Sequence, residues 1–187
     1  MTEKEKMLAG ELYTLDQSLK EELMNAKELC HAYNQLNPSQ KEERRQLIRK
    51  LFGRVGTTFL IEQPFICDYG FNIEIGENFY ANHHLTILDG NKVIFGDDVL
   101  IAPNCSFYTA GHPLEPELRK AGLEYAKPIR IGNRVWIGGN TVVLPGVTIG
   151  DDSVIGAGSV VTKDIPAGVV AVGNPCKVVR KIEREME

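Results

Sequence analysis

The sequence lacks the surplus of positive charge that nucleic-acid-binding proteins carry. Its 21 lysine and arginine residues are outnumbered by 25 aspartate and glutamate residues, which gives a formal net charge of -4. A protein that binds nucleic acid by neutralising phosphates needs a concentrated basic surface. We therefore expect no nucleic-acid partner, and we expect the basic residues to act only locally.

Long apolar runs are also missing. No run approaches the roughly 18 apolar residues of a membrane span, and the N-terminal stretch MTEKEKMLAG has no apolar signal-peptide core. The 187 residues, of which 43% are hydrophobic, are enough to form one sizeable core. We expect a cytoplasmic protein without a membrane partner.

The cysteines do not form a metal-binding or disulfide pattern. There is no C-x-x-C pair and no zinc-ribbon spacing, and three of the four cysteines have apolar neighbours. The spacing predicts reduced, structural thiols at Cys30, Cys67, Cys105 and Cys176.

Residues 1–56 have the periodicity of helices. Within residues 18–36, apolar side chains recur on one helical stripe, and Asn37-Pro38 ends the pattern. A second helical pattern begins near residue 39. Two helices cannot form a core alone, so we expect this segment to lie against the rest of the chain.

The spacing of polar residues predicts how these helices begin. Ser18 with Glu21, and Ser39 with Glu42, have the spacing of capping boxes. Asp16 precedes the first long helix, where an N-cap or a first-turn charge is its simplest role.

From residue 131 the chain repeats every six residues, as IGNRVW, IGGNTV, VLPGVT, IGDDSV, IGAGSV and VTKDIP. A hexapeptide period is typical of a β-solenoid, in which each short strand lies on a different side of a prism. Three hexads make one coil, so residues 18 apart should stack about 4.8 Å apart along the axis. The predicted stacks are Ile131 on Ile149, Ile137 on Ile155, and Val143 on Val161.

Residues between the stacked aliphatics predict the interior corners and the outer faces. Outward apolar pairs, Trp136 with Val154 and Val142 with Val160, would leave exposed stripes on two walls of a monomer, so we predict a homo-oligomer. Small residues should fill the interior corners, namely Val135, Thr141, Ser153 and Ser159.

The same rhythm occurs earlier in the chain, but less regularly. Hexads begin at Ile75, Phe95 and Ile101, with a two-residue slip near Asp89-Gly90. The solenoid should therefore run from about residue 57 to about residue 172, within a second domain of residues 57–187.

One segment interrupts the repeat. Residues 108–128, YTAGHPLEPELRKAGLEYAKP, are charged and flanked by proline, and we expect them to form an irregular loop extruded from the prism. Such a loop could reach a neighbouring subunit. It carries His112, and an imidazole is the side chain best suited to remove a proton from a hydroxyl near neutral pH. A surface histidine without a catalytic role is the simpler alternative.

The hexads, together with NFYAN, GHP and the N-terminal helices, closely resemble the maltose and galactoside O-acetyltransferases of the hexapeptide-repeat superfamily. The resemblance covers nearly the whole chain. It implies a left-handed parallel β-helix and a homotrimer with active sites between subunits. It also implies transfer of acetyl from acetyl-CoA to the 6-hydroxyl of a sugar such as maltose, glucose or a galactoside, with no metal.

The resemblance also implies roles for individual residues. His112 would be the general base, Asn82 would stabilise the transition state, and the backbone N–H of Gly139 would contact the thioester. A turn role is the alternative for Asn82. The other CoA-binding positions would be Trp136, Ala157, Thr162, Lys163, Lys177 and Arg180, although the charged run from Lys177 onward also has the composition of a solvated tail.

Acceptor-binding residues would be Asp16, Asp68, Tyr80, Asp89 and Glu124. Two of them depart from the galactoside enzymes, which have serine at the position of Asp68 and methionine at that of Glu124. Gly90 also stands where some members have aspartate. These departures favour maltose or glucose and leave the acceptor open.

Other functions also fit the repeat. A non-sugar acceptor, such as an antibiotic or an amino acid, would need the same fold. A γ-type carbonic anhydrase would need three histidine ligands, and only His83, His84 and His112 are candidates; neighbours on a strand point to opposite sides, which disfavours a shared ion. A non-catalytic solenoid scaffold is the third alternative.

Overall fold

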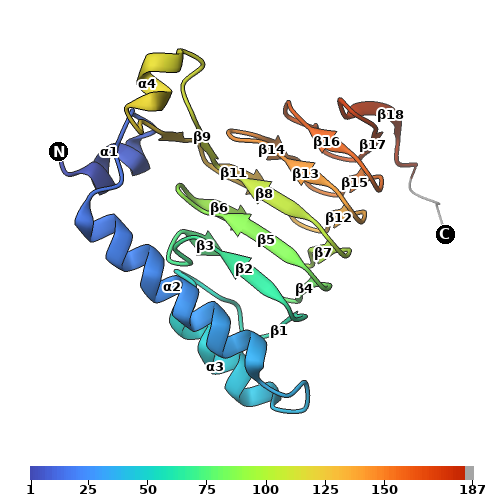
Figure 1. Ribbon diagram of the computed structural model, residues 1–187. Coiled ribbons are helices and arrows are strands. Elements are labelled where there is room, and N and C mark those ends of the chain that lie inside the picture. Colours follow the sequence, from blue (N-terminus) through green and yellow to red (C-terminus); the bar gives the residue numbers. More distant parts are fainter. Residues whose placement is uncertain (184–187) are drawn as a thin grey trace.

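The computed structural model describes residues 1–183, and its main body is a three-walled prism of stacked parallel strands (Figure 1). The chain crosses the three walls in a fixed order, and each complete circuit adds one coil. The first wall comprises β3 (Ile73–Glu74), β6 (Val93–Phe95), β11 (Ile129–Ile131) and β14 (Thr148–Ile149).

The other two walls are longer. The second wall comprises β1 (Phe59–Ile61), β4 (Phe79–Ala81), β7 (Leu100–Ile101), β12 (Trp136–Ile137), β15 (Val154–Ile155) and β17 (Val169–Val172), ending with the antiparallel β18 (Lys177–Lys181). The third wall comprises β2 (Phe65–Cys67), β5 (Leu85–Leu88), β8 (Ser106–Tyr108), β13 (Val142–Val143) and β16 (Val160–Val161).

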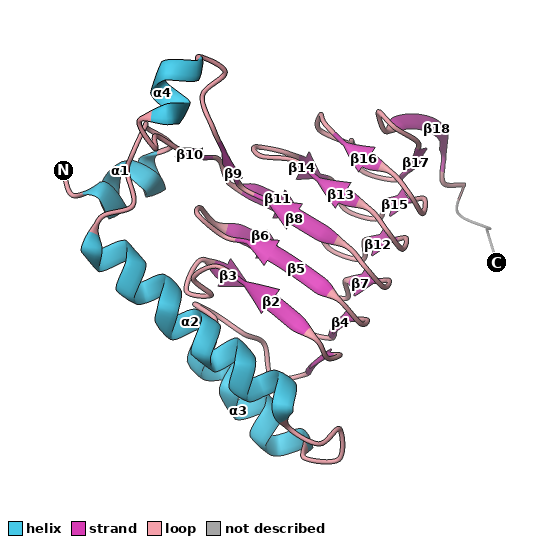
Figure 2. Cartoon of the chain, viewed as in Figure 1, coloured by secondary structure: helices cyan, strands magenta, loops and turns pink. Residues whose placement is uncertain are grey.

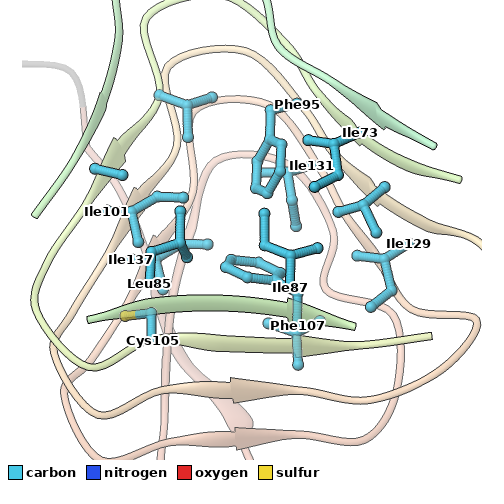
Figure 3. Packing of buried hydrophobic residues seen from close by; sticks show 14 of the residues in the cluster. Ile73, Leu85, Ile87, Phe95, Ile101, Cys105, Phe107, Ile129, Ile131 and Ile137 are labelled. Carbon is cyan, nitrogen blue, oxygen red and sulfur yellow. The ribbon is translucent and has the colours of Figure 1, made fainter. Parts of the chain in front are cut away.

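The predicted stacking is confirmed in all three walls. Ile131 pairs with Ile149, Ile137 with Ile155, and Val143 with Val161, each in a parallel register. Their side chains point into the prism, where Phe95 and Phe107 pack edge to face with ring centroids 5.0 Å apart (Figure 3). The predicted corner residues Val135, Thr141, Ser153 and Ser159 are buried as well.

The corners repeat their backbone conformation from coil to coil. Between the first and second walls, Asn78, Asp98, Arg134 and Asp152 all have positive φ angles. Between the second and third walls, His84, Asn104 and Asn140 do the same. Each coil turns through this left-handed conformation, which short polar residues and glycine adopt at the least cost.

Helices cover one end of the prism (Figure 2). They are α2 (Gln17–Gln35) and α3 (Lys41–Leu51), whereas α1 (Glu3–Ala9) contacts Tyr125–Ala126 of the extruded loop, which also contains α4 (Pro116–Lys120). Among the described residues, no helix is long and apolar enough to cross a membrane.

The two predicted capping boxes are wrong. Helix α2 begins one residue before Ser18, because the carboxylate of Asp16 accepts a hydrogen bond from the Leu19 backbone N–H at 2.9 Å and caps the helix. Asp16 is thus the N-cap. Helix α3 begins at Lys41 after Gln40, without a side-chain cap, and Ser39 instead donates its hydroxyl to the side chain of Asn37.

Helix α2 packs along the end of the third wall. Its Asn34 exchanges two hydrogen bonds with the backbone of Phe65 in β2, and its Cys30 sulfur lies 3.6 Å from that of Cys67. All four cysteines are buried free thiols, which confirms their predicted structural role.

The extruded loop is more ordered than we predicted. Residues Ala110–Gly111 (β9) and Tyr125–Ala126 (β10) form an antiparallel ladder, and α4 lies between them. Gly111 is needed here, because a Cβ atom at that position would lie 2.6 Å from the ring of Tyr125. The loop is therefore a folded unit that leaves the prism after β8, a strand of the third wall.

The first part of the charged C-terminal run is solvent-exposed, as expected of a solvated tail, but it is an ordered strand. Lys177–Lys181 form β18, an antiparallel extension of the second wall beside β17, although all five side chains are exposed. The tail ends in residues 184–187, outside the described part of the chain.

The outer faces of the walls differ in polarity. On the second wall, Leu60, Tyr80, Leu100, Trp136 and Val154 follow one another from strand to strand, and Trp136 is 54% exposed. The third wall pairs Val142 with Val160. The predicted outward pairs are thus confirmed, whereas the first wall presents Arg130 and Thr148.

Candidate active site

The candidate catalytic residues His112 and Asn82 lie at two different corners of the prism. The His112 corner, where the third wall passes to the first, comprises residues 68–72, 89–92, 109–128, 144–147 and 162–164. The Asn82 corner, where the second wall passes to the third, comprises residues 82–84, 102–104, 138–140 and 156–158. Because strands of the third wall run from one corner to the other, the two corners lie at opposite edges of that wall (Figure 1).

His112 follows β9 and is exposed. Its Nδ1 lies 3.3 Å from the carbonyl oxygen of Leu123. A carbonyl oxygen can only accept, so this contact requires the proton on Nδ1 and leaves the Nε2 lone pair free. The geometry prepares the imidazole to accept a proton at Nε2.

Asn82 is half-buried in the turn after β4. Its Oδ1 accepts a hydrogen bond from the His83 backbone N–H at 2.7 Å, and its own N–H donates to Ile101. The side-chain amide Nδ2 has no partner among the described residues. Asn82 therefore has a turn role, and it keeps two N–H donors available at the surface of the corner.

Gly139 lies two coils further along the Asn82 corner. Its carbonyl accepts a hydrogen bond from Gly158, but its N–H has no partner in the described chain. The preceding Gly138 packs tightly, because a Cβ atom there would lie 2.5 Å from the backbone nitrogen of Ala157. This corner thus presents a backbone donor beside the exposed Ala157.

Three of the five acceptor-site candidates lie at the His112 corner. Asp68 follows β2, Asp89 follows β5, and Glu124 precedes β10 in the loop. Burial raises the pKa of Asp68 to about 6; Lys27 opposes the rise and Glu124 adds to it. Burial raises the pKa of Asp89 to about 7, against the hydrogen bond from the Tyr69 backbone and with a contribution from the charge of Asp68.

Asp89 is placed differently from the other acceptor candidates. It has no exposed surface, and its Oδ1 accepts hydrogen bonds from the backbone N–H groups of Asp68 and Tyr69 at 3.1 and 2.8 Å. A direct contact with an acceptor is therefore not available to Asp89 in this conformation. It holds the turn that carries Asp68.

Two acceptor candidates lie elsewhere. Tyr80 is on the outer face of the second wall. It pairs with Leu100 on the next strand, and Leu100 pairs with Trp136 on the strand after that. Asp16, the N-cap of α2, comes three residues after Tyr13, which pairs with Glu124.

The cations proposed for CoA come from both edges of the prism. Thr162 and Lys163 are exposed at the His112 corner, after β16. Lys177 and Arg180 are exposed on β18, at the end of the second wall that also carries Trp136. The two groups thus lie on different parts of the prism.

Tyr13 and Tyr69 were missed by the sequence reasoning, and both contribute to the His112 corner. Tyr13 lies between two helices where no periodicity marks it, and Tyr69 lies in a turn. Burial is the first cause that raises the pKa of each phenol, so both remain protonated donors. Only the folded arrangement places them beside the carboxylates.

The strand argument used against a carbonic anhydrase does not hold in the structure. His83 and His84 lie in the turn after β4, so the argument that assigned them to a strand is wrong. Within residues 1–183, no group of three histidine, cysteine, aspartate or glutamate residues is placed to hold a metal ion.

Comparison with known proteins agrees with the fold and with the motifs. Residues 6–56 match the maltose acetyltransferase hexapeptide capping motif, and residues 128–163 match six repeats of the bacterial transferase hexapeptide. The galactoside O-acetyltransferase of Escherichia coli is 52% identical over 95% of this chain and 88% of its own length.

Solved structures give the same result. A maltose O-acetyltransferase from Clostridium difficile superposes with a TM-score of 0.97 at 51% identity, over 98% of this chain and 99% of its own. A galactoside acetyltransferase in complex with coenzyme A gives 0.95 at 51% identity, over 98% and 92%. The expected fold, a left-handed parallel β-helix with N-terminal helices, is thus confirmed.

The repeat, the prism and these matches define a hexapeptide-repeat acetyltransferase. Within that class, the capping motif and the close relatives are specific, and the chain belongs to the maltose and galactoside O-acetyltransferase family.

Proposed function

We propose that this protein transfers acetyl from acetyl-CoA directly to a sugar hydroxyl, with His112 as general base. The hydrogen bond between His112 and Leu123 carries this proposal, because it leaves Nε2 free to take a proton. The hydroxyl oxygen attacks the thioester carbonyl while Nε2 removes its proton. The tetrahedral intermediate then collapses, the C–S bond breaks, and the imidazolium gives its proton to the CoA thiolate.

The negative oxygen of the intermediate needs hydrogen-bond donors. The Nδ2 of Asn82 and the N–H of Gly139 are suited to this role, because neither has a partner in the described chain. No cysteine or serine nucleophile takes part, since the acceptor attacks directly. The chain itself supplies the base and the donors, so the mechanism uses no metal.

The active site is shared between subunits of a homotrimer. The separation of His112 from Asn82 across the third wall supports this arrangement, because a second copy can bring its His112 corner to the first copy's Asn82 corner. The apolar outer faces of the second and third walls supply the contact surface.

The same junction suits CoA. Trp136, Gly139 and Ala157 of one subunit line the thiol arm, while exposed cations meet the phosphates. Those cations are Lys163, beside Thr162, together with Lys177 and Arg180.

The acceptor is a sugar, and its primary 6-hydroxyl is the reacting group. Asp68 and Glu124 lie at the His112 corner, where carboxylate oxygens can accept hydrogen bonds from other sugar hydroxyls. Asp16 adds a contact from the N-terminal segment, and Tyr80, on the second wall, adds one from the neighbouring subunit. The charged pair, in place of serine and methionine, favours maltose or glucose over galactosides.

The experiment that tests this proposal measures release of the CoA thiol from acetyl-CoA, with maltose, glucose, a galactoside, or chloramphenicol as a non-sugar control. Release that depends on a sugar, fastest with maltose or glucose, is expected. Release only with chloramphenicol, or no release with any sugar, would contradict a sugar acceptor.

A further inference from the structure

Tyr13 lies between α1 and α2, outside the strands of the prism, yet it contacts the loop that carries His112. Its backbone forms two reciprocal hydrogen bonds with Glu124, each 3.0 Å, in an antiparallel bridge. Its phenol donates a third to the Glu124 Oε2 at 2.8 Å. Residue 124 is therefore held at its backbone and at its side chain by one residue from the N-terminal segment.

Both chain neighbours of Glu124 contact the segment that carries His112. Leu123, the preceding residue, supplies the carbonyl oxygen that binds Nδ1 of His112. The following residue, Tyr125, pairs with Gly111 in the ladder of β9 and β10. Any displacement of Glu124 would thus move the carbonyl that sets the His112 tautomer.

Tyr13 itself is firmly placed. It is 2% exposed and belongs to a small core with Met7, Leu19, Tyr69 and Ala126 that is separate from the core of the prism. The side chain of Asn91 reinforces this core, because its amide donates to the carbonyl oxygens of Met7, Leu8 and Ala126.

The hydrogen bond to Tyr13 also orients the Glu124 carboxylate. With Oε2 bound to the phenol, Oε1 has no partner in residues 1–183 and can accept a hydroxyl hydrogen. Asp68 lies near enough for the Glu124 charge to raise its pKa, so the two carboxylates share this corner.

We propose that Tyr13 is a positioning residue for acetyl transfer: it orients Glu124 toward the acceptor and, through Leu123, holds His112 with Nε2 free. The N-terminal helical segment thereby takes part in building the active site, in addition to covering one end of the prism. This inference rests on the proposed function, in which Glu124 binds the acceptor and His112 is the base.

The test replaces Tyr13 by phenylalanine, which keeps the ring and the backbone bridge and removes only the phenol hydrogen bond. We expect the KM for the acceptor to rise about tenfold, with a smaller fall in kcat and an unchanged KM for acetyl-CoA. Tyr33→Phe is the matched control, since it removes a buried phenol that donates to the Ile61 carbonyl oxygen and accepts from Arg44 in the helical end, away from the loop. It should leave the acceptor KM unchanged.

A double-mutant cycle separates positioning from general destabilisation. In a Glu124→Gln background, Tyr13→Phe should change the acceptor KM by less than about twofold, because the orienting bond is already weakened. An unchanged acceptor KM in the single variant, or the full tenfold effect in the Glu124→Gln background, would overturn the proposal.

Failure of the proposed function would look different. A wild type without sugar-dependent release of CoA would remove the acetyl-transfer proposal, and the positioning role would then be read from the imidazole nitrogen NMR signals of His112. These should report the Nδ1–H tautomer in the wild type and a mixture of tautomers in a Tyr13→Ala variant. The same tautomer in both proteins would overturn the positioning role.

Discussion

The Nδ1 atom of His112 lies 3.3 Å from the carbonyl oxygen of Leu123, eleven residues further along the same loop. The loop that leaves the prism therefore returns to select the Nδ1–H tautomer of its own histidine. This contact leaves Nε2 as the ring nitrogen of His112 that can accept a proton.

Replacing His112 by alanine should lower kcat by about 10² to 10⁴, because the acceptor hydroxyl loses its base. The affinity for CoA should be unchanged. Steady-state kinetics and a CoA titration would check both, with His31→Ala, an exposed histidine on α2, as the control. Wild-type turnover in the His112 variant would contradict the mechanism.

Replacing Arg180 by alanine should raise the KM for acetyl-CoA roughly three- to tenfold and leave kcat nearly unchanged, because an exposed cation contributes modestly to phosphate binding. Arg45→Ala, which removes an exposed cation on α3, should have no effect. An unchanged KM for acetyl-CoA in the Arg180 variant would remove Arg180 from the CoA site.

Introducing a charge at Leu100 should dissociate the proposed trimer. Leu100 is 49% exposed in the single chain and lies between Tyr80 and Trp136 on the second wall. A buried, unpaired carboxylate at an interface is strongly unfavourable, so Leu100→Asp should yield monomers without activity. Light scattering after size exclusion measures this, and Arg130→Asp on the first wall is the control. A trimeric Leu100→Asp protein would place the interface elsewhere.

The raised pKa of Asp89 predicts a pH-dependent stability. The folded state raises this pKa from its ordinary value near 3.8 to about 7, so the folded protein binds more protons than the unfolded chain between those values. The resulting stabilisation is fully present below the unfolded-state pKa, and it is lost as the pH rises through the folded-state pKa.

The Asp89→Asn variant lacks this titration but keeps an oxygen that can accept from Tyr69. Its free energy of unfolding relative to the wild type should increase by on the order of 2 kcal/mol between about pH 4.5 and about pH 8. Urea unfolding at several pH values measures the difference. A difference that does not vary with pH would show that Asp89 does not titrate in this range.

The repetitive part of the fold could be predicted from the sequence because every hexad adopts the same strand and turn. Ile131, Ile137 and Val143 recur with a fixed period, so their stacking partners follow from counting. The local signals were weaker at the helix starts. Ser18 has a capping-box spacing, but the helix begins earlier, because the carboxylate of Asp16 accepts the hydrogen bond from the Leu19 N–H and is the N-cap.

The candidate site also has a part that the sequence predicted and a part that it did not. His112 and Asn82 stand in short motifs, and the chain order alone assigns them to different corners. Tyr13 has no such signal, because its value comes from an antiparallel bridge to a residue 111 positions away. The burial of Asp89 was also not predictable, since it depends on how the turn at Asp68 folds over it. Contacts between distant segments, unlike periodic ones, are decided only by the assembled structure.

The most direct test of a shared active site is subunit complementation. His112→Ala and Asn82→Ala chains, each with a different affinity tag, would be co-expressed, and mixed trimers would be isolated through both tags. If each site takes His112 from one subunit and Asn82 from its neighbour, every trimer that contains both kinds of chain keeps about one third of its sites, because only one junction pairs an intact His112 with an intact Asn82. Mixed trimers should then recover sugar-dependent CoA release far above that of either parent. Activity no higher than that of the parents would contradict the shared site and place both residues in one chain's own centre.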